Sequence, residues 1–336
     1  EEHKRLTLSF YKYTKLNQLD SLRDTLYFNW IKLGVLGRVY LATEGINAQL
    51  SIPENRKLEF IDNLYSHKNF NKVRLNHAVS HELSFYKLSI KIKKEIVAYR
   101  IPNSQFNMNK TGKHLNAEEF NTMIDKPNTV IIDMRNHYEN EVGKFEKAIL
   151  PDVDTSHELL PKTKELLKGK EDENILLYCT GGIRCEKASS YLIHHNFRNV
   201  YQLKGGIINY AKQIKEKKLI SKFKGKNFVF DARLGESITE DIISTCHQCN
   251  KACDEHINCE NDACHILFIQ CSNCKDKYKG CCSDDCKKIK NKPIEEQRKL
   301  RRDNPEIAAP LMHHYRDRLR PKLKEMITKK TSGKNK

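Results

Sequence analysis

The sequence of 336 residues contains no run of about 18 consecutive apolar residues, the length that a membrane-spanning helix needs. A secretory signal has an apolar segment followed by a cleavage site of small residues. The first residues of this sequence are polar and show neither feature. We therefore expect a cytoplasmic protein without a membrane partner. A length of this order allows two or three domains, each with its own core.

The sequence also has no glycine-rich fingerprint for a flavin or nicotinamide cofactor and no iron-binding facial triad at a readable spacing. Apolar residues make up only 38% of the chain, and the mean hydropathy is −0.70. Apolar strings such as residues 129–132 and 175–178 are nevertheless typical of buried strands. We therefore expect a folded protein rather than a disordered one.

Positive charge is in excess, with 60 Lys and Arg residues against 43 Asp and Glu residues and a net charge of +17. The excess is unevenly distributed: residues 1–110 carry +8, 111–225 carry +3, 226–286 carry −5 and 287–336 carry +11. The basic tail could attract a polyanion, because each neutralised phosphate releases counterions. It could equally be a solvated surface.

The first hundred residues alternate between strand and helix patterns in the order β-α-β-β-α-β. This order is that of the ferredoxin-like, or split βαβ, fold, which we predict for residues 1–100. Such a domain has two helices on one sheet face and leaves the other face available for a partner. The expected strands lie at residues 6–11, 35–42, 48–52 and within 83–92, and the expected helices at 20–33 and 54–65.

A polar segment, residues 101–114, predicts a linker to a second domain of α/β type at residues 115–222. Asn116 and Glu119 have the spacing of a capping box at the start of a short helix. The remaining expected elements are strands at 128–133 and 174–178 and a helix at 157–167.

Cys179 follows the last of these strands and begins a loop with two glycines. At the carboxyl end of a buried parallel strand, successive amides of such a loop can point at one atom. These amides, the next helix and Arg184 would stabilise a thiolate and lower the pKa of Cys179. A buried cysteine beside a flexible turn is the alternative. The other candidate loop residues are Thr180, Gly181, Gly182, Ile183, Arg184 and Cys185.

Cys185 lies six residues after Cys179 and has two interpretations. It could resolve a persulfide or sulfenate on Cys179 by forming a transient disulfide. It could instead be a small residue packed in the first turn of the helix. We favour packing.

Residues 179–184 resemble the six-residue C-x-x-G-x-R active-site loop of rhodanese domains, in which the first Cys carries a persulfide. Lys144 and Lys147 stand where that family usually has His and Gly, so we assign neither a catalytic role. The other segments similar to rhodanese domains are the entry strand at 130–135, the E-x-G-H-F-x-G-A-I segment at 141–149 and the L-x-G-G turn at 203–207.

Almost the whole chain resembles the bacterial tRNA uridine-34 hydroxylases, which are oxidoreductases of the rhodanese superfamily. The resemblance rests on RVYLATEGINA at residues 38–48, CTGGIRCEK at 179–187 and the cysteine-rich end. It implies oxygen-dependent 5-hydroxylation of the wobble uridine of tRNA, with molecular oxygen as co-substrate and Cys179 as the essential residue. The partner would be the anticodon stem-loop, held by the N- and C-terminal parts of the chain.

Two other functions stay open. A sulfurtransferase would pass sulfane sulfur from Cys179 to a small acceptor, a protein or tRNA, and its product would contain sulfur. A non-catalytic, zinc-stabilised RNA-binding protein would keep its binding after loss of the Cys179 thiol.

Ten of the twelve cysteines lie in residues 223–336, which we predict to be a metal-binding region with a basic tail. Two C-x2-C pairs have the knuckle spacing of tetrahedral zinc, and in a reducing compartment clustered cysteines favour metal over disulfides. An iron–sulfur cluster is the alternative centre. Two four-cysteine sites would leave two cysteines over, and spacing does not fix the pairing. The candidate ligands are Cys246, Cys249, Cys253, Cys259, Cys264, Cys271, Cys274, Cys281, Cys282 and Cys286.

Overall fold

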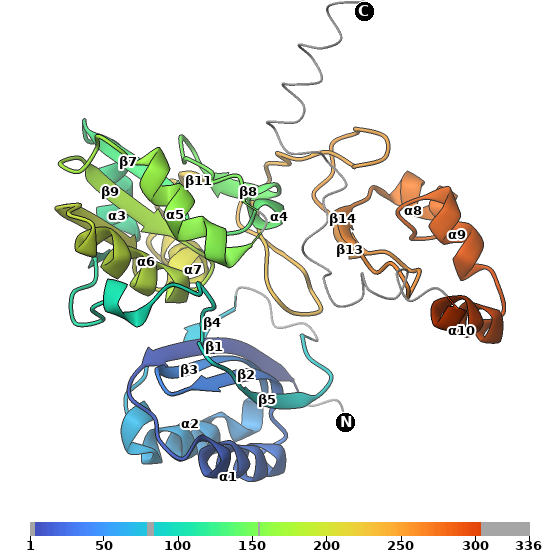
Figure 1. The fold of residues 1–336 in the computed structure, drawn as a ribbon, viewed down its shortest axis with the longest axis horizontal. Helices are drawn as coiled ribbons and strands as arrows, with labels where there is room; N and C mark the ends of the chain where they lie inside the picture. Colours follow the sequence, from blue (N-terminus) through green and yellow to red (C-terminus); the bar gives the residue numbers. More distant parts are fainter. Residues whose placement is uncertain (1–3, 79–83, 154, 304–336) are drawn as a thin grey trace, which may run out of the picture.

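The computed structural model describes residues 4–78, 84–153 and 155–303. Figure 1 shows an N-terminal sheet with its helices, a central α/β part and a C-terminal part that contains three short helices. This arrangement confirms the predicted fold class of a ferredoxin-like domain, a rhodanese-like domain and a cysteine-rich region. No helix in the described ranges combines the length and the apolar character needed to cross a bilayer.

The N-terminal sheet has five strands in the order β4-β1-β3-β2-β5. The fourth strand of the β-α-β-β-α-β pattern is β4, whose two residues are too few for a period-2 signal in the sequence. The strand expected within residues 83–92 is β5, which pairs parallel to β2 at the opposite edge. The elements are β1 (Arg5–Tyr13), α1 (Leu19–Lys32), β2 (Leu36–Ala42), β3 (Gly45–Pro53), η1 (Glu54–Arg56), α2 (Lys57–Ser66), η2 (Lys68–Phe70), β4 (Asn76–His77) and β5 (Leu88–Ile92).

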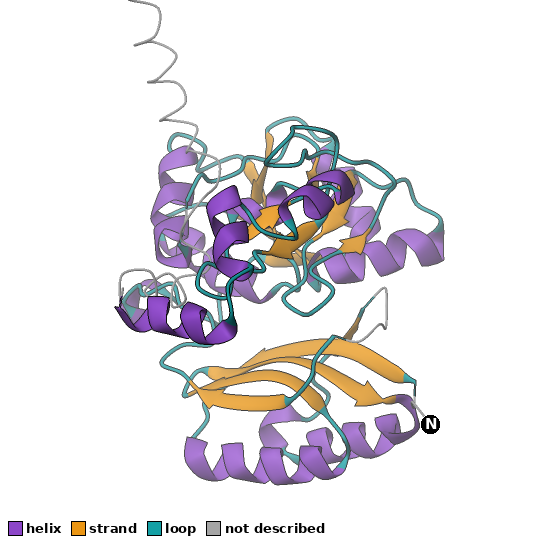
Figure 2. Ribbon diagram, turned by 90° about the vertical axis from the view of Figure 1, so that its right-hand side faces the viewer, coloured by secondary structure: helices purple, strands orange, loops and turns teal. Residues whose placement is uncertain are grey.

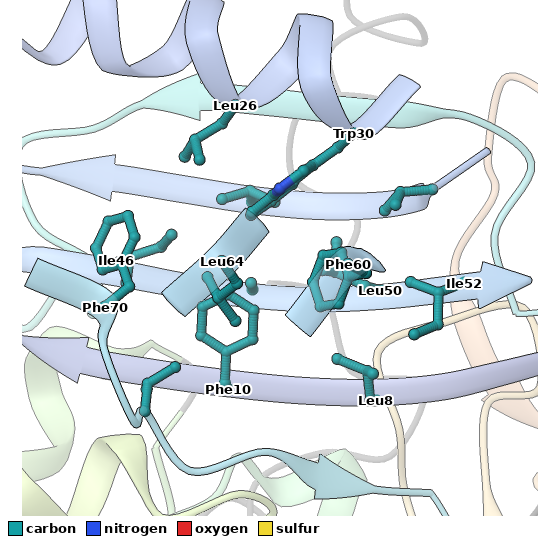
Figure 3. Packing of buried hydrophobic residues seen from close by; sticks show 14 of the residues in the cluster. Leu8, Phe10, Leu26, Trp30, Ile46, Leu50, Ile52, Phe60, Leu64 and Phe70 are labelled. Atoms are coloured by element: carbon teal, nitrogen blue, oxygen red, sulfur yellow. The ribbon is translucent and has the colours of Figure 1, made fainter. Parts of the chain in front are cut away.

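Helices α1 and α2 cover one face of this sheet, and the packing there forms the core of the N-terminal domain. The Trp30 ring lies 5.4 Å from the Phe60 ring and 6.5 Å from the Phe10 ring, between helix and strand (Figure 3). Because side chains alternate along a strand, Ser9 and Tyr11 project from the face opposite to Phe10. Figure 2 shows that this helix-free face is turned toward the central domain.

The central domain is built on a parallel sheet in the order β6-β10-β9-β7. Strand β9 is an inner strand, and four of its five residues are buried. Strand β6 pairs with β10 in this sheet but begins at Lys113, within the segment predicted as a linker. We therefore propose that the central domain starts at Lys113. The elements are η3 (Asn103–Gln105), β6 (Lys113–Leu115), α3 (Ala117–Ile124), β7 (Thr129–Asp133), α4 (His137–Asn140), β8 (Gly143–Phe145), α5 (Ser156–Leu166), β9 (Asn174–Tyr178), α6 (Ile183–His194), β10 (Asn199–Leu203) and α7 (Gly206–Lys217).

The C-terminal part begins by pairing with the central domain, because β11 is antiparallel to both β8 and β12. Strands β13 and β14 then form a two-stranded antiparallel sheet, followed by three helices. Most of the predicted basic tail, residues 304–336, lies outside the described residues. The elements are β11 (Phe223–Asn227), β12 (Glu236–Ser237), β13 (His256–Asn258), β14 (Leu267–Ile269), α8 (Ser272–Tyr278), α9 (Asp284–Lys290) and α10 (Ile294–Asp303).

Candidate active site

Cys179 is fully buried where β9 ends, and the loop that follows it curls around its sulfur. Gly182 has φ +100°, in the left-handed region that glycine adopts without steric cost, and it precedes the first residue of α6. In this conformation the Gly182 N–H donates a hydrogen bond to Cys179 Sγ at 3.1 Å. The loop therefore directs an amide at the sulfur, as its glycine content predicts.

The surroundings of Cys179 favour its thiolate. Burial works against ionisation, but the Cys185 thiol, the Arg184 charge and the amides of Cys185 and Gly182 outweigh it and lower the pKa of Cys179 to about 6. Burial and the neighbouring Cys179 sulfur raise the pKa of Cys185 well above its usual range. Cys185 is thus a neutral hydrogen-bond donor to Cys179, and its side chain is buried in the first turn of α6.

Arg184 is held by Glu139, a residue that we did not select from the sequence. Its guanidinium forms a bidentate ion pair with the Glu139 carboxylate at 2.5 and 2.8 Å. The Thr180 hydroxyl donates to the same carboxylate at 3.0 Å. Burial opposes the charge of Glu139, but Arg184 holds the pKa of Glu139 below its usual range. Glu139 therefore fixes both ends of the loop around Cys179.

A second buried pair stabilises the strand next to β9. Asp133, at the end of β7, accepts hydrogen bonds from Arg135 Nε at 2.9 Å and from the Tyr178 hydroxyl at 2.7 Å. Both Asp133 and Arg135 are fully buried, so each charge depends on the other. This network lies directly before Cys179 in the sheet and keeps the two strand ends together.

The N-terminal domain contacts the Cys179 loop, although its sequence showed no catalytic pattern. The Tyr11 hydroxyl donates to Glu186 Oε1 at 3.0 Å, and Asn76 Nδ2 donates to the Gly181 carbonyl at 3.4 Å. A Cβ on Gly182 would lie 2.9 Å from the Tyr11 hydroxyl, so this position has little room for a side chain. These contacts have no sequence signal, because each joins segments more than a hundred residues apart.

A buried lysine joins the same two domains. Lys187 is 2% exposed, and its Nζ lies 2.9 Å from Glu44 and 2.9 Å from Glu95, both in the N-terminal part. Glu44 belongs to the TEGIN sequence that supported the family resemblance. Since an uncompensated buried charge is costly, these carboxylates help to seat the N-terminal domain on α6.

A cavity of about 610 Å³ lies between the helix-free sheet face and the Cys179 loop. All three parts of the structure contribute to its walls, among them strands β1 to β4 of the N-terminal sheet, the Cys179 loop and α4 of the central domain, and the segment after β11. Cys179 itself lies behind this wall, with its side chain enclosed by the loop. The cavity is thus the space through which a ligand would approach the loop.

Because Cys185 lowers the pKa of the Cys179 thiol, we predict how its replacement changes the reactivity of Cys179. Cys185→Ala removes a hydrogen-bond donor to the Cys179 thiolate, so we expect the pKa of Cys179 to rise from about 6. The thiolate is the nucleophile, so its alkylation should decline as the pH falls through the pKa, and in the variant this decline should occur at higher pH. Rates of alkylation at Cys179, followed by peptide mass spectrometry from pH 5 to 9, would measure the shift. Superimposable profiles would contradict the assigned role of Cys185.

Eight of the ten candidate metal ligands form two compact groups in which the four sulfur atoms lie within 4.8 Å of one another. Representative Sγ–Sγ distances are 3.6 Å for Cys249 and Cys271 and 3.7 Å for Cys264 and Cys282. A tetrahedron with zinc–sulfur bonds of about 2.3 Å needs about 3.8 Å between sulfurs, so both groups fit a single zinc ion. The first group is Cys246, Cys249, Cys271 and Cys274, and the second is Cys259, Cys264, Cys282 and Cys286.

The other two cysteines, Cys253 and Cys281, lie outside both groups and are buried. All twelve cysteines are free thiols rather than disulfides. The Cys282 N–H lies 3.4 Å from Cys259 Sγ, which is the kind of amide contact that supports a thiolate ligand. The structure therefore provides two sites that could each hold a metal ion and leaves two thiols over.

The two departures from the rhodanese pattern have different structural settings. Lys144 lies in β8 opposite Lys224 of β11, where both side chains are partly exposed. Lys147 has φ +62°, a conformation that glycine adopts more readily than any other residue. The glycine usual at this position in rhodanese domains thus suits the backbone that Lys147 retains here.

Comparison with known families agrees with the three parts of the structure. The family described as UPF0176 acylphosphatase like domain matches residues 5–96, the rhodanese-like domain family matches 116–213, and the family described as Rhodanase C-terminal matches 224–287. A rhodanese-like domain of Anabaena sp. among the solved structures is 17% identical, covers 33% of this chain and 78% of its own, and has a TM-score of 0.27. The buried strand, the cysteine loop and the paired arginine define a rhodanese-domain protein.

Two curated relatives narrow this class. A tRNA uridine(34) hydroxylase of Leptospira interrogans is 50% identical over 97% of this chain and 88% of its own length. A second, from Yersinia pestis, is 52% identical over 90% of this chain and 85% of its own length. This chain belongs to the tRNA uridine(34) hydroxylase family, which confirms the resemblance seen in the sequence.

Proposed function

We propose that this protein hydroxylates C5 of the wobble uridine, position 34 of tRNA, using molecular oxygen and the sulfur of Cys179 as thiolate or persulfide. The observation that carries the proposal is the identity of 50% over 97% of the chain with a curated hydroxylase of that base. The loop geometry supports Cys179 as the reactive group, because its amides and Arg184 favour a negative sulfur. An outer persulfide sulfur would be stabilised by the same groups.

The reaction needs an electron donor as well as oxygen. Replacing the C5 hydrogen by a hydroxyl removes two electrons from the base, whereas reducing molecular oxygen to the level of water consumes four. A reductant must therefore supply the other two electrons, and the second oxygen atom leaves as water.

The substrate part of the proposal is the anticodon stem-loop. Bases of a single-stranded loop can be unstacked at low cost, which lets an enzyme receive one base in a pocket. The cavity beside the Cys179 loop is the receiving space in this proposal. Mature tRNA functions in translation, so we assign the reaction to the cytoplasm.

Nucleoside analysis tests the proposal directly. In a host with a single route to 5-hydroxyuridine, deletion of the gene should remove this nucleoside from tRNA, and the wild-type gene should restore it. Cys179→Ser should leave it at the level of the deletion strain, because the reactive sulfur is lost. Cys281→Ser is the matched control, since Cys281 lies outside the loop and outside both cysteine groups and packs in a separate cluster with Phe268. Undiminished 5-hydroxyuridine in the deletion strain, or full activity of Cys179→Ser, would reject the proposal.

The second candidate function is sulfur transfer, favoured by the match of residues 116–213 to the rhodanese-like domain family. The same cradle would hold a persulfide that is then attacked by a sulfur acceptor. The two functions differ in product: sulfur transfer yields thiocyanate or a thiolated base, whereas hydroxylation consumes oxygen and adds no sulfur. Purified protein given thiosulfate and cyanide would show which applies.

A further inference from the structure

A row of polar side chains crosses the helix-free face of the N-terminal sheet, and the strand register sets its order. Ser9 pairs with Asn76 of β4 on one side and with Gln49 of β3 on the other. Gln49 in turn pairs with Arg38 of β2. Residues directly opposite in neighbouring strands project from the same face, so the row runs Asn76, Ser9, Gln49, Arg38. All four line the cavity.

Asn76 carries the clearest sign of an absent ligand. Its side chain is 6% exposed, and its Nδ2 is used in the hydrogen bond to the Gly181 carbonyl. Its Oδ1 is buried and accepts no hydrogen bond from any residue in the described ranges. Leaving a buried acceptor without a donor costs free energy, so a ligand in the cavity that donates to Oδ1 would be favoured. Because Asn76 also bonds to Gly181, such a ligand would lie next to the Cys179 loop.

The other end of the row is suited to an anion. Arg38 is exposed at the cavity edge, and neither the Arg38 nor the Gln49 side chain has a hydrogen bond or ion pair with another residue of the described part of the chain. A guanidinium offers planar, always charged donors that match phosphate oxygens. Gln49, between the two ends, offers a donor and an acceptor to a planar group.

The neighbouring loop and the size of the cavity fit one nucleotide. Thr180, Gly181 and Arg184 of the candidate catalytic loop also line the cavity, and Gly181 contacts the Asn76 end of the row. Its volume of about 610 Å³ falls within the roughly 300–1,000 Å³ of small-ligand sites. The Tyr40 ring, two residues beyond Arg38 on the same face of β2, adds an aromatic wall on which a base could stack.

We propose that this row is the subsite for the unstacked nucleotide 34, an inference that rests on the proposed function. Asn76 Oδ1 accepts a hydrogen bond from N3–H of the uracil, and Arg38 contacts a phosphate next to it. Uracil presents a donor at N3, whereas cytosine presents an acceptor there. Asn76 is thus a specificity-determining residue that distinguishes uridine from cytidine.

Binding of anticodon stem-loop oligonucleotides to the full chain tests this subsite without relying on turnover. One RNA carries uridine at position 34, and the other carries N3-methyluridine, which lacks the donor. For the wild type we expect about tenfold weaker binding of the methylated RNA, the effect of one buried hydrogen bond. For Asn76→Ala both RNAs should bind with the same, weaker affinity.

Arg38→Ala should weaken binding of both RNAs equally and reduce the slope of log affinity against log salt by about 1. Lys32→Ala is the matched control, because Lys32 is exposed at the end of α1, on the opposite side of the sheet. Gln49→Ala provides a second variant in the row if Asn76→Ala lowers the melting temperature strongly, and it too should weaken binding of the uridine RNA.

The subsite is rejected if Asn76→Ala still discriminates between the two RNAs as the wild type does, if Arg38→Ala and Lys32→Ala have equal effects, or if the wild type binds neither RNA. The nucleoside analysis of complemented cells separates this failure from failure of the proposed function. Normal levels of 5-hydroxyuridine in cells that carry Asn76→Ala and Arg38→Ala would reject the subsite alone. Absence of 5-hydroxyuridine in cells that carry the wild-type gene would reject the proposed function.

Discussion

Glu139→Gln is expected to lower the free energy of unfolding of the central domain by about 3–5 kcal/mol, because it leaves the Arg184 charge buried without its partner. The Glu139 side chain is fully buried, and its carboxylate accepts from both Arg184 and Thr180. Glutamine has nearly the same shape, so the loss comes from the charge and the hydrogen bonds rather than from a cavity. A decrease in the melting temperature on the order of 10 °C should follow.

Glu165→Gln is the matched control for this prediction. Glu165 also pairs with a cation, Lys162, at 3.0 Å, but its side chain is 68% exposed. Exposed pairs contribute about 0–1 kcal/mol, so this variant should melt with the wild type. A Glu139→Gln protein that melts within a degree of Glu165→Gln would show that the Arg184 pair does not hold the loop together.

The Cys179 loop could be predicted from the sequence because its determinants are contiguous. A buried strand, a cysteine, two glycines and an arginine follow one another between Asn174 and Arg184, and the hydrogen bond to Cys179 Sγ comes from within that run. The capping box of Asn116 and Glu119 was predictable for the same reason, and both of its hydrogen bonds are present. Local geometry follows from local sequence.

The groups that complete the site could not be predicted, since they are distant in the chain. Asn136 and Glu139 have the same capping-box spacing, which could have located α4, but nothing in it indicates that Glu139 pairs with Arg184. Asn76 lies in a strand of two residues without periodicity, and it meets Gly181 only because two domains pack together. Contacts of this kind depend on the tertiary arrangement alone.

The grouping of the cysteines could likewise be predicted only in part from the sequence. The C-x2-C spacing identified Cys246 with Cys249 and Cys271 with Cys274 as close pairs, and the structure joins these two pairs. The second group combines two cysteines that precede Cys271 with two that follow Cys274. The two groups therefore interleave along the chain. Several interleaved and sequential pairings satisfy the same spacings, and only the fold selects one.

This pairing makes the two groups unequal in their link to the active site. Cys246 and Cys274 of the first group pack in one apolar cluster with Tyr138 and Phe228. The Tyr138 and Phe228 rings are 5.2 Å apart, and Tyr138 lines the cavity beside the Cys179 loop. The second group packs in a separate cluster around Phe268. A disturbance of the first group should therefore reach the cavity wall more directly.

Cys271→Ser is accordingly expected to cost more activity than Cys286→Ser, although each removes one thiolate from one group. Zinc at such sites contributes about 10–16 kcal/mol to the folding of small zinc domains, so loss of a ligand should release the ion and unfold the segment around it. We expect two metal ions per chain in the wild type and in Cys253→Ser, and one in each ligand variant. Elemental analysis of purified protein, with 5-hydroxyuridine levels in complemented cells, measures both effects. Unchanged metal content in Cys271→Ser would contradict the ligand assignment, and equal activity of the two variants would contradict the link through Tyr138.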